Sequence, residues 1–251
     1  MVNFICLKWG TKYDAEYVNR MYVMLKRNCK EQFTLYCCTE DPSGISNEIQ
    51  IVPLPIEKYD LETYWWKLWI LSKEFPVDGK CIFFDLDTVI QNDIQEIVDF
   101  ECGEDLYVLP AQWRMRRRLI WKNYYTKINS SIMIWDSMLI DDIFSEYIKN
   151  NHYYEMLHPG NDEYLEREYG KVNHLPTHWA YSRLAGFDDT DEDRMWDYAR
   201  DTFLKHEYQI LYKMWNMPDR MICLFNSIRE EDHLDNSVYA GYEHYWSDSM
   251  S

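Results

Sequence analysis

Two aspartates separated by one residue, Asp85 and Asp87, offer the clearest chemistry in the sequence. They directly follow the apolar run Cys81–Phe84, which predicts a buried strand. Because side chains alternate along an extended segment, both carboxylates can point toward one place just beyond that strand. Two buried carboxylates brought together there need a cation or strong hydrogen-bond donors between them, and Mg²⁺ or Mn²⁺ prefers such oxygen ligands, commonly together with substrate phosphates. The pair predicts a metal-diphosphate site; the alternative is a surface turn or helix N-cap, which also uses Asp-x-Asp.

The segments around this acidic pair predict an α/β fold. Apolar runs alternate with stretches of helical spacing, as in a mainly parallel sheet covered by helices. Sheets of this kind bind ligands beyond the carboxyl ends of their strands, where the aspartates lie. The predicted strands are Val2–Leu7, Thr34–Cys38, Ile49–Leu54 and Cys81–Phe84, and the predicted helices are Ala15–Lys26 and Tyr64–Phe75.

The second half of the chain is more mixed. No internal repeat or low-complexity linker divides the 251 residues, so we expect one α/β domain over residues 1–251 with a less regular tail from about residue 227. Apolar runs predict strands and helical spacing predicts helices as before. The predicted strands are Leu106–Ala111, Ser131–Trp135 and Met221–Phe225, and the predicted helices are Leu139–Ile148 and Asp162–Tyr169.

The composition limits the class of protein. The chain is 47% hydrophobic and 17% aromatic, so a folded core is expected over most of its length. Its formal net charge of −17 disfavours a nucleic-acid-binding or anionic-membrane surface. The same charge means that a dianionic ligand needs a metal or local Lys and Arg side chains. No apolar run approaches the roughly 20 residues of a membrane span.

The cysteines and the amino terminus indicate a cytoplasmic protein. The amino-terminal segment lacks the charged region and long apolar stretch of a signal peptide. The seven cysteines lack zinc-type spacing and lie mostly in apolar strands, so we expect reduced core thiols. They are Cys6, Cys29, Cys37, Cys38, Cys81, Cys102 and Cys223.

Several stretches of the sequence, taken in order, carry a more specific pattern. They are KWGTKYDAEYVNRMY (Lys8–Tyr22), CCTEDP (Cys37–Pro42), YWWKLWIL (Tyr64–Leu71), FFDLDTVIQNDI (Phe83–Ile94), INSSIMIWD (Ile128–Asp136) and GNDEYL (Gly160–Leu165). Together they resemble GT-A-fold glycosyltransferases, a Rossmann-like class. The resemblance is greatest to bacterial and viral glycosyltransferases distantly related to the glycogenin and lipopolysaccharide-galactosyltransferase group. It covers roughly residues 1–233.

The resemblance implies a nucleotide-sugar donor, with UDP the expected nucleotide, lying across the carboxyl ends of the first strands. An aromatic face with amide and carboxylate hydrogen bonds suits a uracil, although aromatic side chains in this loop also serve as plain packing residues. The residues implied to hold the base and ribose are Trp9, Gly10, Thr11, Tyr13, Thr39 and Asp41.

The resemblance also implies that Asp85, Leu86 and Asp87 hold Mn²⁺ or Mg²⁺ and the donor diphosphate. Members of this class commonly follow the last core strand with Phe-His-Gly-Lys-Pro, whose His completes the metal shell. Here Asn226 stands at the position of the His, and Ile228 replaces the Lys. An amide oxygen ligates these ions less strongly than imidazole does, so we expect Asn226 as a third, weaker metal ligand. The departure leaves a degenerate enzyme as an alternative.

Four further residues are implied to act on the substrates. Lys67 would neutralise phosphate or touch the sugar, and Arg183 aligns loosely with a donor-binding lysine. Asn129 matches a position that hydrogen-bonds donor or acceptor hydroxyls, and Asp162 is the implied sugar-contacting or catalytic carboxylate. Three of them also have a plain structural interpretation: Lys67 as an exposed helix lysine, Asn129 as a turn residue and Asp162 as a helix N-cap.

The expected reaction is transfer of a sugar to the hydroxyl of a glycan or other acceptor. In an inverting enzyme Asp162 would take the hydroxyl proton, whereas in a retaining one the leaving phosphate can serve as base. Two alternatives remain open: a carbohydrate-binding protein without catalysis, and a haloacid-dehalogenase-type phosphatase. The phosphatase needs Asp-x-Asp-x-Thr near the amino terminus, whereas here Thr88 directly follows Asp87.

Overall fold

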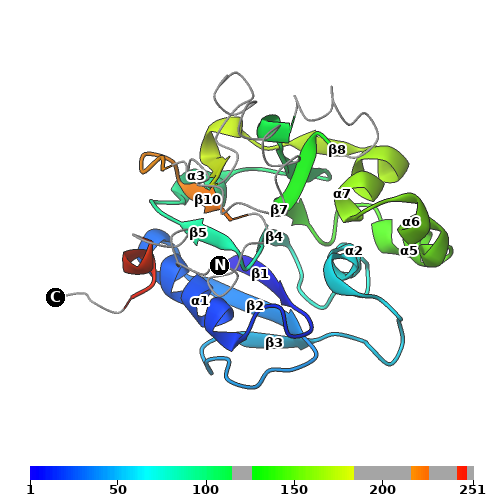
Figure 1. The fold of residues 1–251 in the computed structure, drawn as a ribbon, viewed down its shortest axis with the longest axis horizontal. Helices are drawn as coiled ribbons and strands as arrows, with labels where there is room; N and C mark the ends of the chain where they lie inside the picture. Colours follow the sequence, from blue (N-terminus) through cyan, green and yellow to red (C-terminus); the bar gives the residue numbers. More distant parts are fainter. Residues whose placement is uncertain (115–125, 184–215, 226–241, 248–251) are drawn as a thin grey trace, which may run out of the picture.

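The computed structural model describes residues 1–114, 126–183, 216–225 and 242–247. Within these residues, a seven-stranded sheet in the order β3-β2-β1-β4-β7-β6-β8 forms the centre of the molecule (Figure 1). Its strands are β1 (Val2–Lys8), β2 (Phe33–Thr39), β3 (Gln50–Pro53), β4 (Lys80–Phe84), β6 (Leu106–Pro110), β7 (Ile128–Asp136) and β8 (Val172–His174).

The direction of the strands decides which residues share an edge of the sheet. Strands β3, β2, β1 and β4 pair in parallel, as do β6 and β8, so the predicted mainly parallel sheet is confirmed. Strand β7 runs antiparallel to both β4 and β6. Consequently the amino end of β7 lies beside the carboxyl ends of β1, β2 and β4.

A small second sheet begins directly after the acidic pair. In the described part of the chain it has the strand order β5-β10-β9, with β5 at Thr88–Ile90, β9 at Ala180–Ser182 and β10 at Ile222–Leu224. Strand β10 is antiparallel to β5 and parallel to β9. Of these three strands, only β10 was predicted, because it lies within the five-residue apolar run Met221–Phe225, whereas β5 and β9 have no sequence signal of comparable length.

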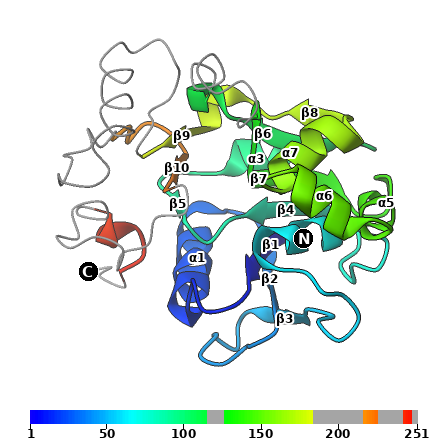
Figure 2. The ribbon, with the colours of Figure 1, turned by 45° about the vertical axis from the view of Figure 1, so that its right-hand side comes forward.

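Helices cover both faces of the large sheet. On one face, α1 and α3 pack with the small sheet around Phe4; on the other, α2, α5 and α7 pack around Ile5. The alternation of side chains along β1 explains why these neighbours enter different cores. Figure 2 shows α5, α6 and α7 grouped on one side and β5, β9 and β10 on the other. The helices are α1 (Ala15–Asn28), α2 (Trp66–Trp69), α3 (Gln95–Asp99), α5 (Ile143–Ile148), α6 (Asn151–Leu157) and α7 (Asn161–Tyr164).

Two boundaries differ from the prediction in ways that matter for the site. The helix predicted at Tyr64–Phe75 is a 3₁₀ turn, Thr63–Trp65, followed by the single turn α2. It stops because the Leu71 and Ser72 amides bond to carbonyls three residues back. Strand β7 begins at Ile128, three residues before the predicted start, so an Asn-Ser-Ser sequence is buried inside the strand.

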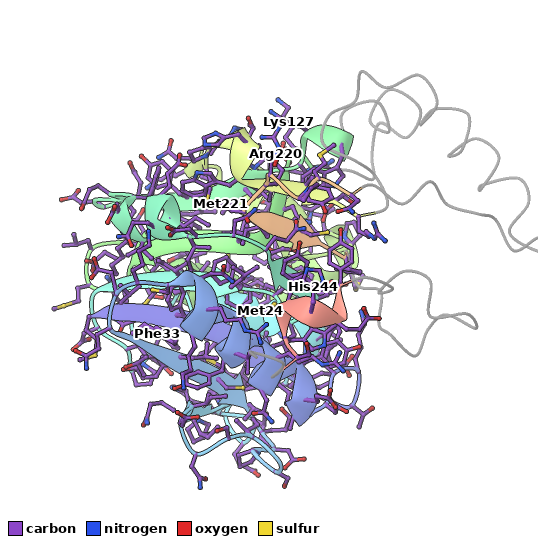
Figure 3. All side chains as sticks on the ribbon, turned by 90° about the vertical axis from the view of Figure 1, so that its left-hand side faces the viewer. Met24, Phe33, Lys127, Arg220, Met221 and His244 are labelled. Carbon is purple, nitrogen blue, oxygen red and sulfur yellow. The ribbon has the colours of Figure 1, made fainter. Side chains whose placement is uncertain are left out.

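The carboxyl-terminal part of the described chain returns to the first helix. The 3₁₀ turn Glu243–Tyr245 lies beside α1 (Figure 3), and the Arg27 guanidinium donates to the His244 carbonyl at 2.7 Å. The Gln91 amide donates to the Tyr245 hydroxyl at 3.0 Å, which joins the turn to the end of β5. None of the helices in the described residues is long and apolar enough to cross a membrane.

Candidate active site

Asp85 lies at the expected place, directly after β4, and its carboxylate is bound by a cation from the protein itself. The Lys67 ammonium donates to Asp85 Oδ1 at 2.7 Å and to Oδ2 at 2.8 Å. The Lys67 side chain is 8% exposed and that of Asp85 is 24% exposed. Charge-assisted bonds of this length are strong where water is scarce. Lys67 is therefore a buried partner of the acidic pair.

Lys67 can reach this position because α2 is held by packing. All four residues of α2 are buried, and the aromatic rings of Trp65 and Tyr147 stack at 5.3 Å. The turn that leads into α2 starts at Thr63, whose φ is +50°. Left-handed backbone costs an L-residue about 1–2 kcal/mol, and such strain collects near functional sites.

Asp162 joins the same network from α7. The Ser130 amide donates to Asp162 Oδ1 at 3.0 Å, and the Asn161 amide group donates to Ser130 Oγ at 2.9 Å. The Lys67 ammonium also reaches Ser130 Oγ at 3.2 Å and the Ser130 carbonyl at 3.3 Å. Helix α2, the loop after β4, strand β7 and helix α7 thus meet at one place.

Tyr64 connects this network to the loop that precedes α7. Its hydroxyl donates to the Pro159 carbonyl at 2.6 Å. Its ring packs closely on Gly160, since a Cβ added to that glycine would lie 3.4 Å from the ring. Burial raises the pKa of Tyr64, and the charges of Glu163 and Asp162 raise it further. The hydroxyl therefore remains a proton donor throughout neutral pH.

Asn129 is buried at the start of β7, one residue before the Ser130 junction. Its side-chain oxygen accepts from the Ser131 amide at 3.0 Å, and the Ser131 carbonyl accepts from the Asp85 amide at 3.0 Å. Asn129 therefore shapes the strand end against which Asp85 rests.

The residues implied to hold the nucleoside lie beyond β1 and β2. The Thr39 hydroxyl and the Asp41 main chain exchange hydrogen bonds of 3.1 Å, and the buried Lys8 ammonium donates to the Asp41 carbonyl at 3.1 Å. Hydrogen bonds from Ser43 lower the pKa of Asp41, as does the charge of Lys8. This turn is fixed and carries a carboxylate that stays ionised.

The loop after β1 is fixed by a glycine. Gly10 has φ +65°, a conformation that favours glycine, and its amide donates to Glu40 Oε1 at 2.6 Å. Trp9 and Tyr13 are partly buried against the cores on either side of the sheet, and Tyr13 meets Tyr17 edge to face at 5.0 Å. Thr11 is exposed.

Asp87 is 7% exposed and lies between the two sheets. Its carbonyl accepts from the Phe225 amide at 3.0 Å, at the end of β10. Asn226, the expected third metal ligand, is the next residue but lies outside the described residues. Leu86, between the two aspartates, is buried in the core that contains α1.

Arg183 lies at the end of β9, on the small-sheet side. It is buried, its amide donates to the Leu224 carbonyl at 2.8 Å, and its guanidinium stacks over the Tyr242 ring at 4.7 Å. The Tyr242 and Tyr181 hydroxyls are joined at 2.7 Å. The Arg183 guanidinium thus packs on an aromatic cluster, and its role toward a donor remains a prediction.

The acidic pair fits a hard divalent cation. A carboxylate has about four lone-pair positions, so Asp85 can accept from Lys67 and still offer oxygen to a metal. Mg²⁺ and Mn²⁺ commonly use one or two protein carboxylates and take the rest of their ligands from phosphates and water. Within the described ranges, no group of three or more His, Cys, Asp or Glu side chains could hold a metal by itself.

Four residues of this edge were not expected from the sequence. Ser130 and Asn161 join Lys67 to Asp162, whereas Lys8 and Glu40 fix the turns after β1 and β2. The signal for Ser130 was present, because polar residues inside an otherwise apolar strand must be satisfied by hydrogen bonds when buried. The others depend on pairings that only the tertiary structure supplies.

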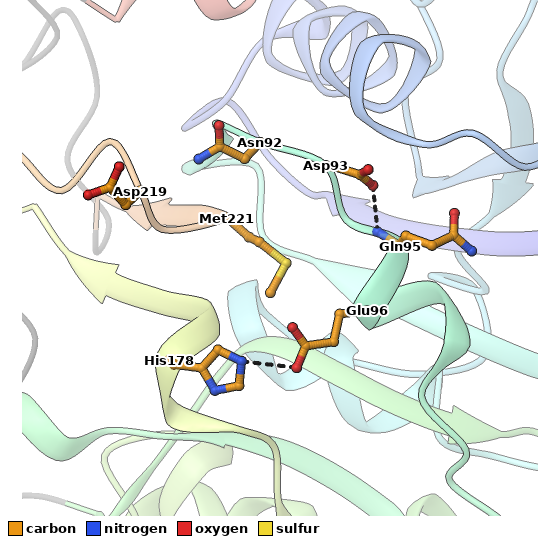
Figure 4. A pocket seen from close by; sticks show the side chains of 7 residues that line it. All are labelled: Asn92, Asp93, Gln95, Glu96, His178, Asp219 and Met221. Carbon is orange, nitrogen blue, oxygen red and sulfur yellow. Dashed lines mark hydrogen bonds and ion pairs between the residues drawn. The ribbon is translucent and has the colours of Figure 1, made fainter.

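A pocket of about 420 Å³ lies away from this network, beyond the far end of β5. It contains none of the predicted site residues. In this pocket His178 Nε2 lies 2.9 Å from Glu96 Oε1 (Figure 4). The lining residues are Asn92, Asp93, Gln95, Glu96, His178, Asp219 and Met221.

The sheet order, the acidic turn after β4 and the small second sheet together define a GT-A fold, the fold of one large class of glycosyltransferases. No protein-family model and no curated protein sequence matches the chain. The assignment to this fold class rests on solved structures.

Structures of three proteins show the extent of the likeness. An active-site mutant of LgtC has a TM-score of 0.64 at 12% identity, covering 97% of this chain and 94% of LgtC. A second similar structure is the galactosyltransferase LgtC in complex with donor and acceptor sugar analogs. The glycosyltransferase GlyE of Streptococcus pneumoniae has a TM-score of 0.59 at 12% identity, covering 99% of this chain and 62% of GlyE. Mouse xyloside xylosyltransferase 1 has a TM-score of 0.51 at 12% identity, covering 90% and 97%.

Proposed function

We propose that this protein is a metal-dependent glycosyltransferase that moves a sugar from a nucleotide-sugar donor, a UDP-sugar, to an acceptor hydroxyl. The observation that carries the proposal is the junction of Lys67, Asp85 and Asp162 at the ligand-binding edge of a GT-A sheet. Such an edge is where sheets of this kind bind nucleotides. The similar fold of LgtC, a galactosyltransferase described in complex with donor and acceptor sugar analogs, supports the proposal.

The donor is assigned to the first half of this edge. The turns that contain Thr39 and Asp41, and the loop from Trp9 to Tyr13, hold the base and ribose. Asp85 and Asp87, with Asn226, would hold Mn²⁺ or Mg²⁺. A cation bound there would supply positive charge opposite the donor diphosphate, which is worth several kcal/mol in the transition state.

The acceptor is assigned to the side of the junction formed by β7 and α7. Asp162 is the group that accepts the proton of the attacking hydroxyl if the reaction inverts the sugar. The Ser130 amide holds one of its oxygens at 3.0 Å and so fixes the plane of the carboxylate. Lys67 keeps Asp85 oriented, and Asn129 hydrogen-bonds a sugar hydroxyl. The anomer of the product, read by proton NMR, separates inversion from retention.

The experiment has two stages. Thermal shift with Mn²⁺ is run against UDP, GDP, CMP and free glycans, and donor turnover is then measured with the nucleotide that stabilises the protein. Asp85→Ala and Asp87→Ala should each lower Mn²⁺-dependent turnover about 100-fold or more, which corresponds to about 3 kcal/mol. Asp93→Ala, an exposed acid at the other end of β5, should leave turnover unchanged.

Two results would contradict the proposal. Unchanged turnover in both aspartate variants would remove the metal-diphosphate site. Stabilisation by free glycan, with none by any nucleotide, would indicate a carbohydrate-binding protein without catalysis.

A further inference from the structure

Ser130 uses every polar group it has to connect three elements. Its amide donates to Asp162, its carbonyl accepts from Lys67, and its hydroxyl oxygen lies within hydrogen-bond distance of both Lys67 and Asn161. The partners are 63 residues away in one direction and 31 in the other.

The chemistry of a hydroxyl makes this junction rigid. A serine oxygen has two acceptor positions, and the Lys67 ammonium at 3.2 Å and the Asn161 amide group at 2.9 Å account for both. Neither donor can be displaced cheaply by water, because Ser130, Asn161 and Lys67 are each at least 94% buried. An unsatisfied donor in such a place is costly.

The location of the junction gives it a consequence for catalysis. On one side, Lys67 grips both oxygens of Asp85; on the other, Asn161 is followed directly by Asp162. The Ser130 hydroxyl therefore contributes, with the main-chain bonds of Ser130, to setting the separation between the metal-side carboxylate and the acceptor-side carboxylate. Small displacements of reacting groups cost large factors in rate.

We propose that the Ser130 hydroxyl is a positioning group that locks the Asn161–Asp162 turn to the Lys67–Asp85 pair. It touches no substrate and sets the distance between the donor side and the acceptor side of the site. The kinetic part of this inference rests on the proposed function; the positioning itself does not.

The kinetic test uses Ser130→Ala, which removes the oxygen and keeps both main-chain bonds. We expect kcat for transfer to fall about tenfold while the donor KM changes less than twofold. Asn161→Ala should likewise lower kcat and leave the donor KM nearly unchanged. The double variant should be no slower than either single variant, since both substitutions remove the same contact between Asn161 and Ser130. Ser137→Ala is the control: this buried serine lies just past the other end of β7 and donates to the Val77 carbonyl at 2.6 Å.

A second measurement reads the positioning without turnover. Hydrogen exchange, followed by mass spectrometry, should speed up about tenfold in peptides covering residues 160–164 of Ser130→Ala and stay at the wild-type rate there in Ser137→Ala. A wild-type protein that turns over no nucleotide sugar would refute the proposed function, and the exchange result would still decide this inference. The positioning role of Ser130 would be overturned if Ser130→Ala kept both the kcat and the exchange rate of the wild type. It would also be overturned if Ser130→Ala and Ser137→Ala lost the same factor in kcat.

Discussion

The ion pair between Lys67 and Asp85 makes a prediction that needs no ligand. At an effective dielectric constant of about 20, two unit charges about 3 Å apart attract by about 5 kcal/mol. Most of this is offset by desolvation. Breaking a fully buried pair costs about 3–5 kcal/mol, whereas exposed pairs are worth less than about 1 kcal/mol. With side-chain exposures of 8% and 24%, this pair lies between the two cases, so we expect a coupling free energy of about 2 kcal/mol.

The assay is a double-mutant cycle on the free energy of unfolding in urea, with EDTA present. Lys67→Met alone should cost about 2–3 kcal/mol, because it leaves the Asp85 carboxylate without its cation and removes one of the two donors to the Ser130 hydroxyl. Adding Asp85→Asn to Lys67→Met should cost much less than Asp85→Asn does in the wild type. The coupling should persist in 1 M salt, since a buried pair is poorly screened.

A matched pair on the surface provides the control. Lys58 and Glu74 approach to 2.6 Å, and their side chains are 56% and 47% exposed. Their coupling should be much smaller and should disappear in salt. If the losses in unfolding free energy of Lys67→Met and Asp85→Asn add up to that of the double variant within about 0.3 kcal/mol, the reasoning from burial is refuted.

Three further predictions concern single residues. Gly10→Ala should cost about 1 kcal/mol in urea unfolding, from the left-handed backbone alone, because a Cβ there meets nothing within 4 Å. Tyr64→Phe should cost about 1 kcal/mol through its lost hydroxyl bond, while Tyr153→Phe, at an exposed tyrosine, should cost nothing measurable. Burial raises the pKa of Cys223 in the folded protein from its usual 9.0 to about 12. The unfolded chain therefore loses this thiol proton at a lower pH than the folded protein does, and the free energy of unfolding falls as the pH rises from about 9 to 12. Under reducing conditions, Cys223→Ala should make this fall shallower by about 1.4 kcal/mol per pH unit, and an unchanged slope would contradict the prediction.

The sequence predicts the scaffold of the site better than its contacts. Apolar runs located β1, β2, β3 and β4 to within about two residues, and the place of Asp85 beyond β4 followed from them. The partner of Asp85 did not follow, because Lys67 is 18 residues away and no local pattern pairs them. Ion pairs of this kind are set by how elements pack.

The misjudged start of β7 shows a second limit. Asn129 and Ser130 are polar and precede the predicted strand, which favours a turn by local propensity. In the folded chain they are buried strand residues, and their side chains and amides are satisfied by hydrogen bonds with Ser131, Asp162 and Asn161. Tertiary partners outweighed local preference at the place where the site is built.

The reversed direction of β7 has a consequence for how such proteins diversify. Because this strand starts at the edge where the proposed substrates would bind, a residue added or removed directly before Ile128 would enter at that edge and leave the strand pairing untouched. Changes upstream of β6 or downstream of Asp136 enter at the opposite edge. Under the proposed function, variation in acceptor choice should therefore concentrate directly before Ile128, where specificity could be exchanged without redesigning the sheet.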